Sequence, residues 1–136
     1  MSNCIFCSIV EGRVPSYTIY QDKNLLAIMD RYPSTKGHVL ILPKRHVTDI
    51  YGLNNEEAAE ILPLAQKISA KMRDVLGMEG LNLIQNNGKA AGQVVDHFHL
   101  HLVPRYENDG VTIKASPDFD RSEEALEGLM GLLKLR

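Results

Sequence analysis

Cysteine is scarce in this 136-residue chain: Cys4 and Cys7 are the only two, and both stand near the first residue. Two cysteines cannot form the disulfide framework of a small secreted domain, and a chain of this length buries enough apolar surface to fold without one. The chain also lacks an apolar run long enough for a membrane span, and its first residues lack the basic and apolar regions of a signal peptide. We therefore expect a cytoplasmic protein without a membrane partner.

An excess of basic residues is missing as well. Fifteen Lys and Arg stand against 17 Asp and Glu, which gives a net charge of −2, whereas proteins that bind nucleic acid through its phosphates carry strongly basic surfaces. The composition, with 44% hydrophobic residues, also excludes a collagen or a disordered tail. We expect a single domain over residues 1–136 that binds neither DNA nor RNA.

The apolar pattern predicts about five strands. They are expected at residues 17–21, 25–29, 39–42, 81–85 and 94–103. The first two are separated by three polar residues and read as a hairpin, and the third is an uninterrupted apolar run typical of a buried strand. Pro104 is expected to end the fifth strand.

Two main helices are predicted beside these strands. Asn54 and Glu57 form a capping box before a long amphipathic helix that ends near Gly77. Pro63 lies within that pattern and predicts a kink or a late start. A second helix follows Ser122, and a short helical segment is expected at 4–11. Because helices and strands do not alternate regularly, the predicted class is α+β with an antiparallel sheet.

Histidine has an uneven distribution, because three of the five histidines fall at His97, His99 and His101. In a strand, alternate side chains share a face, so these three imidazoles would lie together and the apolar residues between them would face the core. Three explanations compete: a polar face without special chemistry, a three-histidine metal site, and nucleophilic or acid–base chemistry. The polar loop at 86–93 contains two glycines and amide side chains suited to an anion, which favours a phosphate site with a nucleophile.

Residues 97–103 resemble the His-x-His-x-His motif, followed by two apolar residues, of the histidine triad (HIT) superfamily of nucleotide-binding proteins and hydrolases. The resemblance extends from residues 4–7 through Asp30, residues 37–38 and residues 43–46 to residues 104–105, and it is most similar to the bacterial Hint-like branch. It implies a homodimer of α+β subunits whose five-stranded sheet continues across the interface. The HIT-like core would span about residues 4–106, followed by a tail and helix at 107–136.

The resemblance also implies an activity. Such proteins bind purine nucleoside monophosphates and cleave nucleoside phosphoramidates, or related adenosine 5′-phosphate derivatives, at the α-phosphorus. The resemblance implies that His99 is the nucleophile and forms a covalent nucleotidyl-histidine. It also implies that His101 carries a proton beside the leaving group and that His38 and His97 support these two histidines. No cofactor is needed for this chemistry. The alternatives are a nucleotide-binding or scaffold protein with incidental hydrolysis, and a histidine-ligated metalloenzyme.

The resemblance also implies which residues of this chain form a nucleotide pocket. The residues assigned to it are Ile5, Phe6, Ile9, Val14, Ile28, Asp30, Arg31, Leu40, Asn86, Gly92, Gln93, Val94, His99 and His101. Asp30 would bind the ribose hydroxyls, although it also suits a turn before Pro33, and the apolar members also suit ordinary core packing. Val94 departs from the family, where many members carry serine, and we expect an altered leaving-group preference.

The two cysteines have the Cys-x-x-Cys spacing of half a zinc site, which needs two further ligands. His46 is a candidate third ligand, and related bacterial proteins with the same opening imply His97 as the fourth. Two thiolates and two imidazoles would fill a tetrahedral Zn²⁺, so the ion would be structural. A pair of buried thiols and a redox-active pair remain as alternatives.

Overall fold

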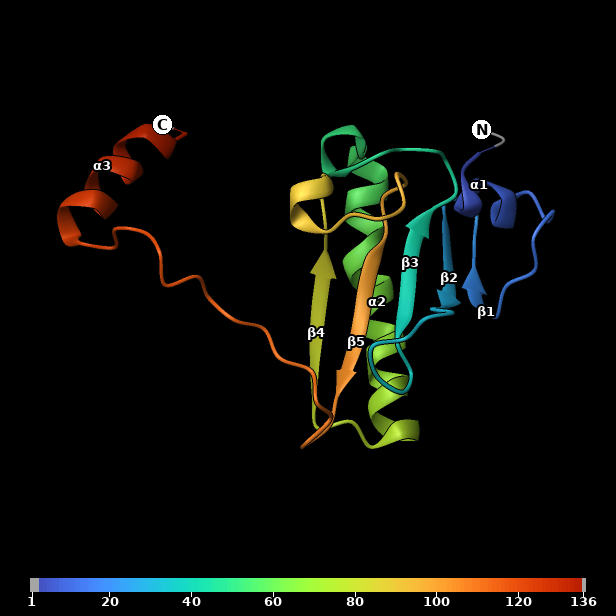
Figure 1. The fold of residues 1–136 in the computed structure, drawn as a ribbon. Coiled ribbons are helices and arrows are strands. Elements are labelled where there is room, and N and C mark those ends of the chain that lie inside the picture. The colour runs from blue at the N-terminus through green and yellow to red at the C-terminus, as the bar shows by residue number, and fades with distance from the viewer. Residues whose placement is uncertain (1–2, 136) are drawn as a thin grey trace.

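The computed structural model describes residues 3–135. Within these residues five strands form one antiparallel sheet with the order β1-β2-β3-β5-β4 (Figure 1). The strands are β1 (Thr18–Gln21), β2 (Leu25–Met29), β3 (Val39–Pro43), β4 (Gly80–Gln85) and β5 (Leu100–Arg105). The predicted α+β class with a five-stranded antiparallel sheet is confirmed. Among the described residues, no helix combines the length and the apolar character that crossing a membrane requires.

In the described part of the chain three α-helices accompany the sheet: α1 (Ile5–Val10), α2 (Asn55–Leu76) and α3 (Glu123–Leu133). The predicted capping box is present, since the Asn54 side chain accepts from the Glu57 amide at 2.8 Å and the Glu57 side chain accepts from the Asn54 amide at 3.1 Å. The predicted late start of α2 is wrong, because Pro63 lies inside the helix. Pro63 and Ala59 are exposed, so water can bind the Ala59 carbonyl that the proline leaves without a partner.

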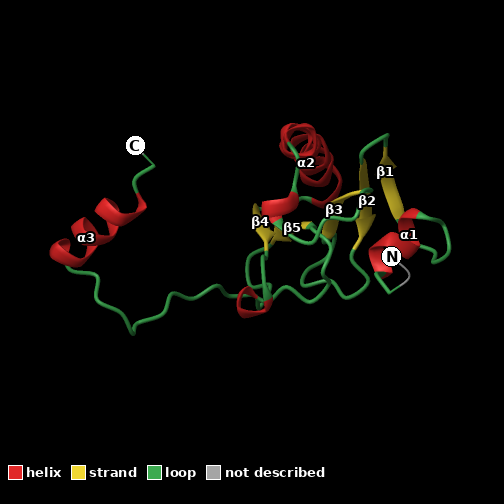
Figure 2. Ribbon diagram, turned by 90° about the horizontal axis from the view of Figure 1, so that it is seen from above, coloured by secondary structure: helices red, strands yellow, loops and turns green. Residues whose placement is uncertain are grey.

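The sheet is covered on both faces. Helix α2 packs on one face (Figure 2), where Ile61, Ala65 and Met72 join a core with side chains from β2, β3 and β5. On the opposite face Phe6 of α1 packs against Leu26, Ile28, Leu40 and Leu42. Alternate residues of β2 and β3 therefore belong to different clusters, which is why both strands read as uninterrupted apolar runs.

The strand that carries the histidines differs from its prediction. It begins at Leu100 rather than at residue 94, and it continues through Pro104 to Arg105. The residues before Leu100 are outside the sheet: the Phe98 amide donates to the Val47 carbonyl at 2.7 Å instead of to a neighbouring strand. The Pro104 carbonyl accepts from Thr35 Oγ1 at 2.6 Å, on the side where β3 pairs only with residues 100–102. Because N–H and C=O of one residue point to the same side of a strand, the proline removes no hydrogen bond to β4.

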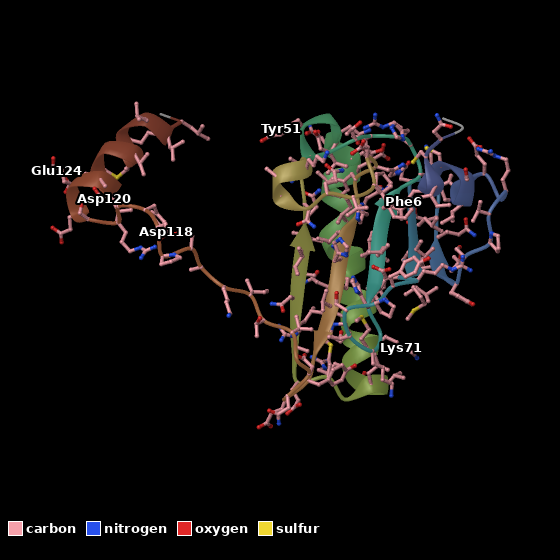
Figure 3. All side chains as sticks on the ribbon, viewed as in Figure 1. Phe6, Tyr51, Lys71, Asp118, Asp120 and Glu124 are labelled. Carbon is pink, nitrogen blue, oxygen red and sulfur yellow. The ribbon has the colours of Figure 1, made fainter. Side chains whose placement is uncertain are left out.

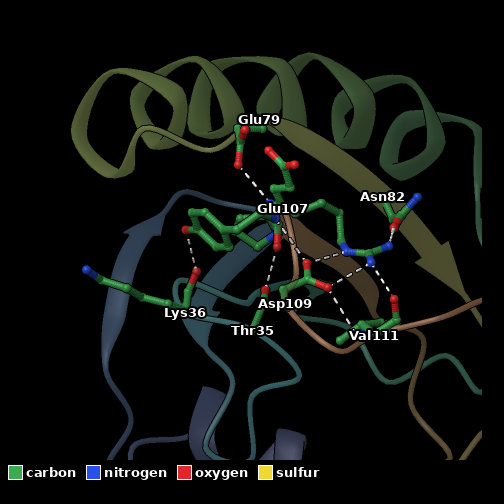
Figure 4. A network of polar contacts seen from close by, with 10 residues as sticks. Thr35, Lys36, Glu79, Asn82, Glu107, Asp109 and Val111 are labelled. Carbon is green, nitrogen blue, oxygen red and sulfur yellow. Dashed lines mark hydrogen bonds and ion pairs between the residues drawn. The ribbon is translucent and has the colours of Figure 1, made fainter.

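The C-terminal part leaves the body after a polar network around Arg105 (Figure 4). Arg105 donates to the Asp109 carboxylate at 2.8 and 3.0 Å, to Asn82 at 2.7 Å and to the Val111 carbonyl at 2.6 Å. Beyond it the chain runs outward to α3, which stands apart from the sheet (Figures 1 and 2), with Asp118, Asp120 and Glu124 on this outlying segment (Figure 3). The predicted helix after Ser122 is confirmed.

Candidate active site and metal centre

A cavity of about 370 Å³ lies on the face of the sheet that α1 covers. Most of the residues assigned to a nucleotide pocket line it: Ile5, Phe6, Ile9, Val14, Ile28, Asp30, Arg31, Leu40, Asn86, Gly92, Val94, His99 and His101. Phe6, labelled in Figure 3, comes from α1 and contacts the ring of His99 edge-on, with the two ring centroids 5.0 Å apart. The cavity is therefore built between α1, the end of β2 and the segment that enters β5.

His99 is held with one ring nitrogen engaged. Its Nδ1 lies 2.7 Å from the backbone oxygen of His97, and because a carbonyl only accepts, Nδ1 carries the proton. The lone pair of the neutral ring is then on Nε2. Burial lowers the pKa of His99, so the ring is neutral at pH 7. A buried neutral imidazole with an unprotonated nitrogen, lining a cavity, is suited to attack an electrophile.

His101 and His38 form a pair of contacting imidazoles beside His99. His101 Nδ1 lies 2.9 Å from His38 Nε2, and the ring centroids of His99 and His101 are 4.8 Å apart. Burial, with repulsion from protonated His99 and His38, lowers the pKa of His101 to about 4. Burial also lowers the pKa of His38 despite the opposing charge of Asp30. All three rings are therefore neutral near pH 7, when they can accept or pass on a proton.

Asp30 uses its two carboxylate oxygens differently. Oδ1 accepts from the Tyr32 amide at 2.8 Å and so closes a turn, while Oδ2 lies 3.4 Å from His38 Nε2. The Asp30 amide donates to the His38 carbonyl at 3.0 Å. The turn and a role at the cavity are thus compatible, because only one oxygen is occupied by the backbone.

The two cysteines meet His46 and His97 in a compact cluster. Their ligand atoms all lie within 4.8 Å of one another, with Cys4 Sγ 3.4 Å from His97 Nδ1 and Cys7 Sγ 3.2 Å from His46 Nδ1. In a tetrahedral zinc site the bond lengths of about 2.0–2.3 Å place ligand atoms roughly 3.3–3.8 Å apart. The geometry of this donor set therefore fits a zinc ion.

The protonation of the cluster also fits a metal. His97 Nε2 lies 2.8 Å from the Pro43 carbonyl and must donate to it, so the lone pair on Nδ1 faces the sulfur atoms. Burial, together with the neighbouring Cys4, raises the pKa of the Cys7 thiol. A bound cation would reverse that effect and stabilise the thiolates.

A family model described as "HIT domain" matches residues 11–108. The chain belongs to the HIT family. It is 36% identical to "Adenosine 5'-monophosphoramidase hnt1" of Schizosaccharomyces pombe over 127 residues, 93% of this chain and 92% of that protein. A crystal structure of a HIT family protein from Bacillus anthracis superposes with a TM-score of 0.86 at 38% identity, covering 96% of this chain and 94% of that one. A zinc-bound histidine triad protein from Mycobacterium smegmatis superposes with a TM-score of 0.77 at 41% identity, covering 86% and 85%.

Within this HIT chain the three histidines of the motif divide between two places. His99 and His101 line the cavity, whereas the ring of His97 is fully buried in the cysteine cluster. His97 nevertheless contacts the candidate nucleophile through its backbone oxygen. The residue therefore supports both sites, one through its ring and the other through its main chain.

One residue assigned to the pocket lies behind the cavity wall. The Gln93 amide donates to the carbonyls of Thr48 and Val95 at 2.7 and 3.1 Å and accepts from the Gly88 amide at 2.8 Å. Its polar atoms hold the loop of this HIT chain together, and its side chain is buried.

Six residues that the motif comparison does not assign also line the cavity of this HIT protein: Pro15, Ser16, Tyr17, Met29, Tyr32 and Val95. Each is a sequence neighbour of an assigned residue or of the segment after α1. Proximity along the chain is the only signal in the sequence that points to them.

Proposed function

We propose that the chain is a nucleotide hydrolase that cleaves nucleoside 5′-phosphoramidates, or related adenosine 5′-phosphate derivatives, through a covalent nucleotidyl-histidine on His99. The observation that carries this proposal is the hydrogen bond from His99 Nδ1 to the His97 carbonyl at 2.7 Å, which leaves the Nε2 lone pair for attack. The relative named as an adenosine 5′-monophosphoramidase supports the same substrate class.

The reaction has two displacements at the α-phosphorus. In the first, His99 Nε2 bonds to phosphorus, the phosphorus–nitrogen bond breaks, and the amine departs with the Nε2 proton of His101, which a proton from solvent replaces so that the ring stays neutral. In the second, water attacks the same phosphorus, its proton returns through His101, and the bond to His99 breaks. The products are a nucleoside monophosphate and an amine, and the enzyme is restored. Donors at Asn86 and around Gly92, which line the cavity, would stabilise charge on the phosphate oxygens.

The cavity suits a purine nucleoside. Apolar side chains such as Ile5, Phe6 and Leu40 line the part nearest α1, and a planar base packs well between such side chains. Asp30 Oδ2, which the backbone leaves free, would accept hydrogen bonds from the ribose hydroxyls. Base, sugar and phosphate would then run from α1 toward His99.

We also propose a structural zinc ion held by Cys4, Cys7, His46 and His97. The donor geometry and the protonation state of His97 support it, as does the zinc-bound relative. When bound, the ion would cross-link α1 to the segment that leads into β5. All four tetrahedral positions belong to the protein, so none remains for a reacting water.

A homodimer whose sheet continues across the interface is part of the same proposal. Strand β4 is an edge of the sheet, and Leu83 on it is 47% exposed. An edge strand with uncovered apolar side chains is suited to pair with a second copy. Single-domain organisation over residues 1–136, with the HIT core followed by a tail, also remains a proposal.

The deciding experiment is intact-mass analysis after rapid mixing with an adenosine phosphoramidate. We expect a transient adduct with the mass of one adenylyl group, absent in His99→Ala. The matched variant His101→Ala keeps the nucleophile and should still form the adduct from a substrate whose leaving group needs no proton. Nucleotide binding without adduct or turnover would instead indicate a binding module. Turnover lost with EDTA while the far-ultraviolet circular dichroism and the nitrogen-15 shifts of His99 are unchanged would indicate a metalloenzyme.

A further inference from the structure

The pair formed by His38 and His101 has two possible protonation patterns. Two neutral imidazoles in contact must divide the roles, one donating and the other accepting. If His38 Nε2 donates to His101 Nδ1, His101 keeps its own proton on Nε2. If the direction is reversed, His101 Nε2 is bare and has no proton for a leaving group. The 2.9 Å contact between the rings does not by itself select one pattern.

A backbone amide selects the pattern. The Ser34 N–H lies 3.0 Å from His38 Nδ1, and an amide can only donate, so Nδ1 carries no proton. A neutral His38 then has its proton on Nε2, which donates to His101 Nδ1 at 2.9 Å in preference to the Asp30 carboxylate at 3.4 Å. His101 in turn keeps its proton on Nε2. One main-chain group thus sets the tautomers of two histidines.

The Ser34 amide is placed by its neighbour Thr35. Thr35 is buried, and its hydroxyl donates to the Pro104 carbonyl at 2.6 Å (Figure 4). Pro104 lies in β5, three residues after His101, so this hydrogen bond ties the loop that carries Ser34 to the strand that carries His101. The backbone amide of His38 donates to the Thr35 carbonyl at 3.3 Å. These hydrogen bonds fix the Ser34 amide, the His38 ring and strand β5 relative to one another.

We propose that Thr35 is a positioning residue, whose buried hydroxyl holds the Ser34 amide on His38 and thereby keeps a proton on His101 Nε2 for the leaving group. The part that concerns the leaving group rests on the proposed hydrolase function. The part that concerns the tautomers does not, because it follows from the hydrogen bonds of the free protein. Thr35 itself touches no substrate in this scheme, and it acts only through the loop.

The test compares Thr35→Val, which keeps the shape and removes the hydroxyl, with Thr35→Ser, which restores it. Tyr106→Phe is the matched control, since it removes an exposed hydrogen bond of 2.8 Å to Lys36 of the same loop (Figure 4). Nitrogen-15 shifts of the imidazoles in the free protein report the tautomers directly. We expect a single tautomer at His38 and His101 in the wild type, in Thr35→Ser and in Tyr106→Phe, and a mixture in Thr35→Val.

Kinetics provide the second measurement. For an amine leaving group we expect kcat of Thr35→Val to fall by roughly tenfold to a hundredfold, with KM nearly unchanged. For p-nitrophenolate, which departs without a proton, the loss should be less than about threefold. Wild-type tautomers in a folded Thr35→Val, or equal losses on both substrates, would overturn the proposal. If Thr35→Val does not fold, Thr35→Ala takes its place. Full activity of Thr35→Ala, in a protein whose wild type has a single tautomer pair, then overturns the proposal. If the wild type has no turnover, the hydrolase proposal fails while the shifts still decide the tautomers.

Discussion

Nδ1 of His99 donates to the backbone oxygen of His97 over 2.7 Å, while the ring of His97 points away from His99 toward the two cysteines. The His97 ring is itself fixed, because Nε2 donates to the Pro43 carbonyl. The tautomer of the candidate nucleophile is therefore set by a residue that is anchored to β3 and to the cysteine cluster. Structural integrity of that cluster and orientation of His99 are linked through a single residue.

This link predicts the effect of removing the metal ligands. We expect about one zinc per purified chain, and we expect Cys7→Ser to lose the zinc and to lower the unfolding free energy by several kcal/mol, since structural zinc sites stabilise on that scale. Elemental analysis and chemical denaturation measure the two quantities. Glu11→Gln, a change at the end of the same helix that leaves the ligands intact, should keep the zinc. Less than about a tenth of an equivalent in protein never exposed to chelator would contradict the site.

The exposed side chain at position 94 predicts a change in leaving-group preference. Val94 lines the cavity and is 90% exposed, so a hydroxyl placed there would be free to donate toward the scissile bond. We expect Val94→Ser to accelerate cleavage of amine and alkoxide leaving groups by up to about tenfold relative to p-nitrophenolate, the scale of one hydrogen bond in the transition state. Val94→Ala, which changes size without adding a donor, is the control. Unchanged relative rates in Val94→Ser would rule out this role.

The elements with local signals could be predicted from the sequence. The capping box of Asn54 and Glu57 and the hairpin before Leu25 are encoded by residues close together in the chain. The start of β5 was not predictable, because residues 97–99 continue the alternating pattern of the strand although the chain enters the sheet only at Leu100. Phe98 still faces the core, yet its amide pairs with Val47, fifty-one positions away. Pairing partners at such separations leave no trace in a local pattern.

The candidate site shows the same division. The residue types of the motif pointed to a nucleophile and to thiolate and imidazole ligands, and the structure brings both groups together. The tautomers could not be predicted, since they depend on carbonyls and amides such as those of Pro43 and Ser34. Side-chain identity says nothing of where main-chain groups meet a ring. The position of Gln93 behind the cavity has the same origin, because its amide is used by three backbone groups.

The lowered pKa of His101 predicts how stability depends on pH. Its ring faces His38 and His99, whose positive forms repel a proton on it, and Asp30, whose charge attracts one; burial outweighs that attraction and the pKa falls to about 4. The unfolded chain binds this proton near pH 6.5. Between pH 6.5 and 4 the unfolded state is therefore protonated first, and the unfolding free energy should fall by roughly 1 kcal/mol per pH unit as the pH decreases.

Chemical denaturation of the wild type and of His101→Gln at several pH values measures this contribution. Carboxylates titrate in both proteins, so the difference between the two unfolding free energies reports His101 together with its coupling to His38 and His99. We expect the difference to be constant above pH 7 and to change between pH 6.5 and 4 in the direction that favours His101→Gln at acid pH. A difference that does not vary with pH would show that the folded protein protonates His101 as readily as the unfolded chain.

The exposed face of α3 predicts what removal of the C-terminal segment does. Leu126, Leu129 and Leu133 lie on one stripe and are 53, 50 and 74% exposed, so the helix contributes little to the stability of its own subunit. Such a stripe needs a partner in water, and in the proposed homodimer a second copy would supply it. A chain ending at residue 115 keeps the contacts of Arg105 with Asp109 and Val111. We expect it to unfold at the wild-type denaturant concentration when monomeric but to dimerise at least about tenfold more weakly.

Sedimentation equilibrium measures the dissociation constant, and circular dichroism in denaturant measures stability at a concentration where both proteins are monomeric. Leu129→Gln tests the stripe without shortening the chain and should weaken the dimer in the same direction, whereas Glu127→Gln on α3 should leave it unchanged. A shortened chain that dimerises normally would show that α3 makes no contact with the second copy. A shortened monomer that unfolds at clearly lower denaturant would show that the C-terminal segment stabilises its own subunit.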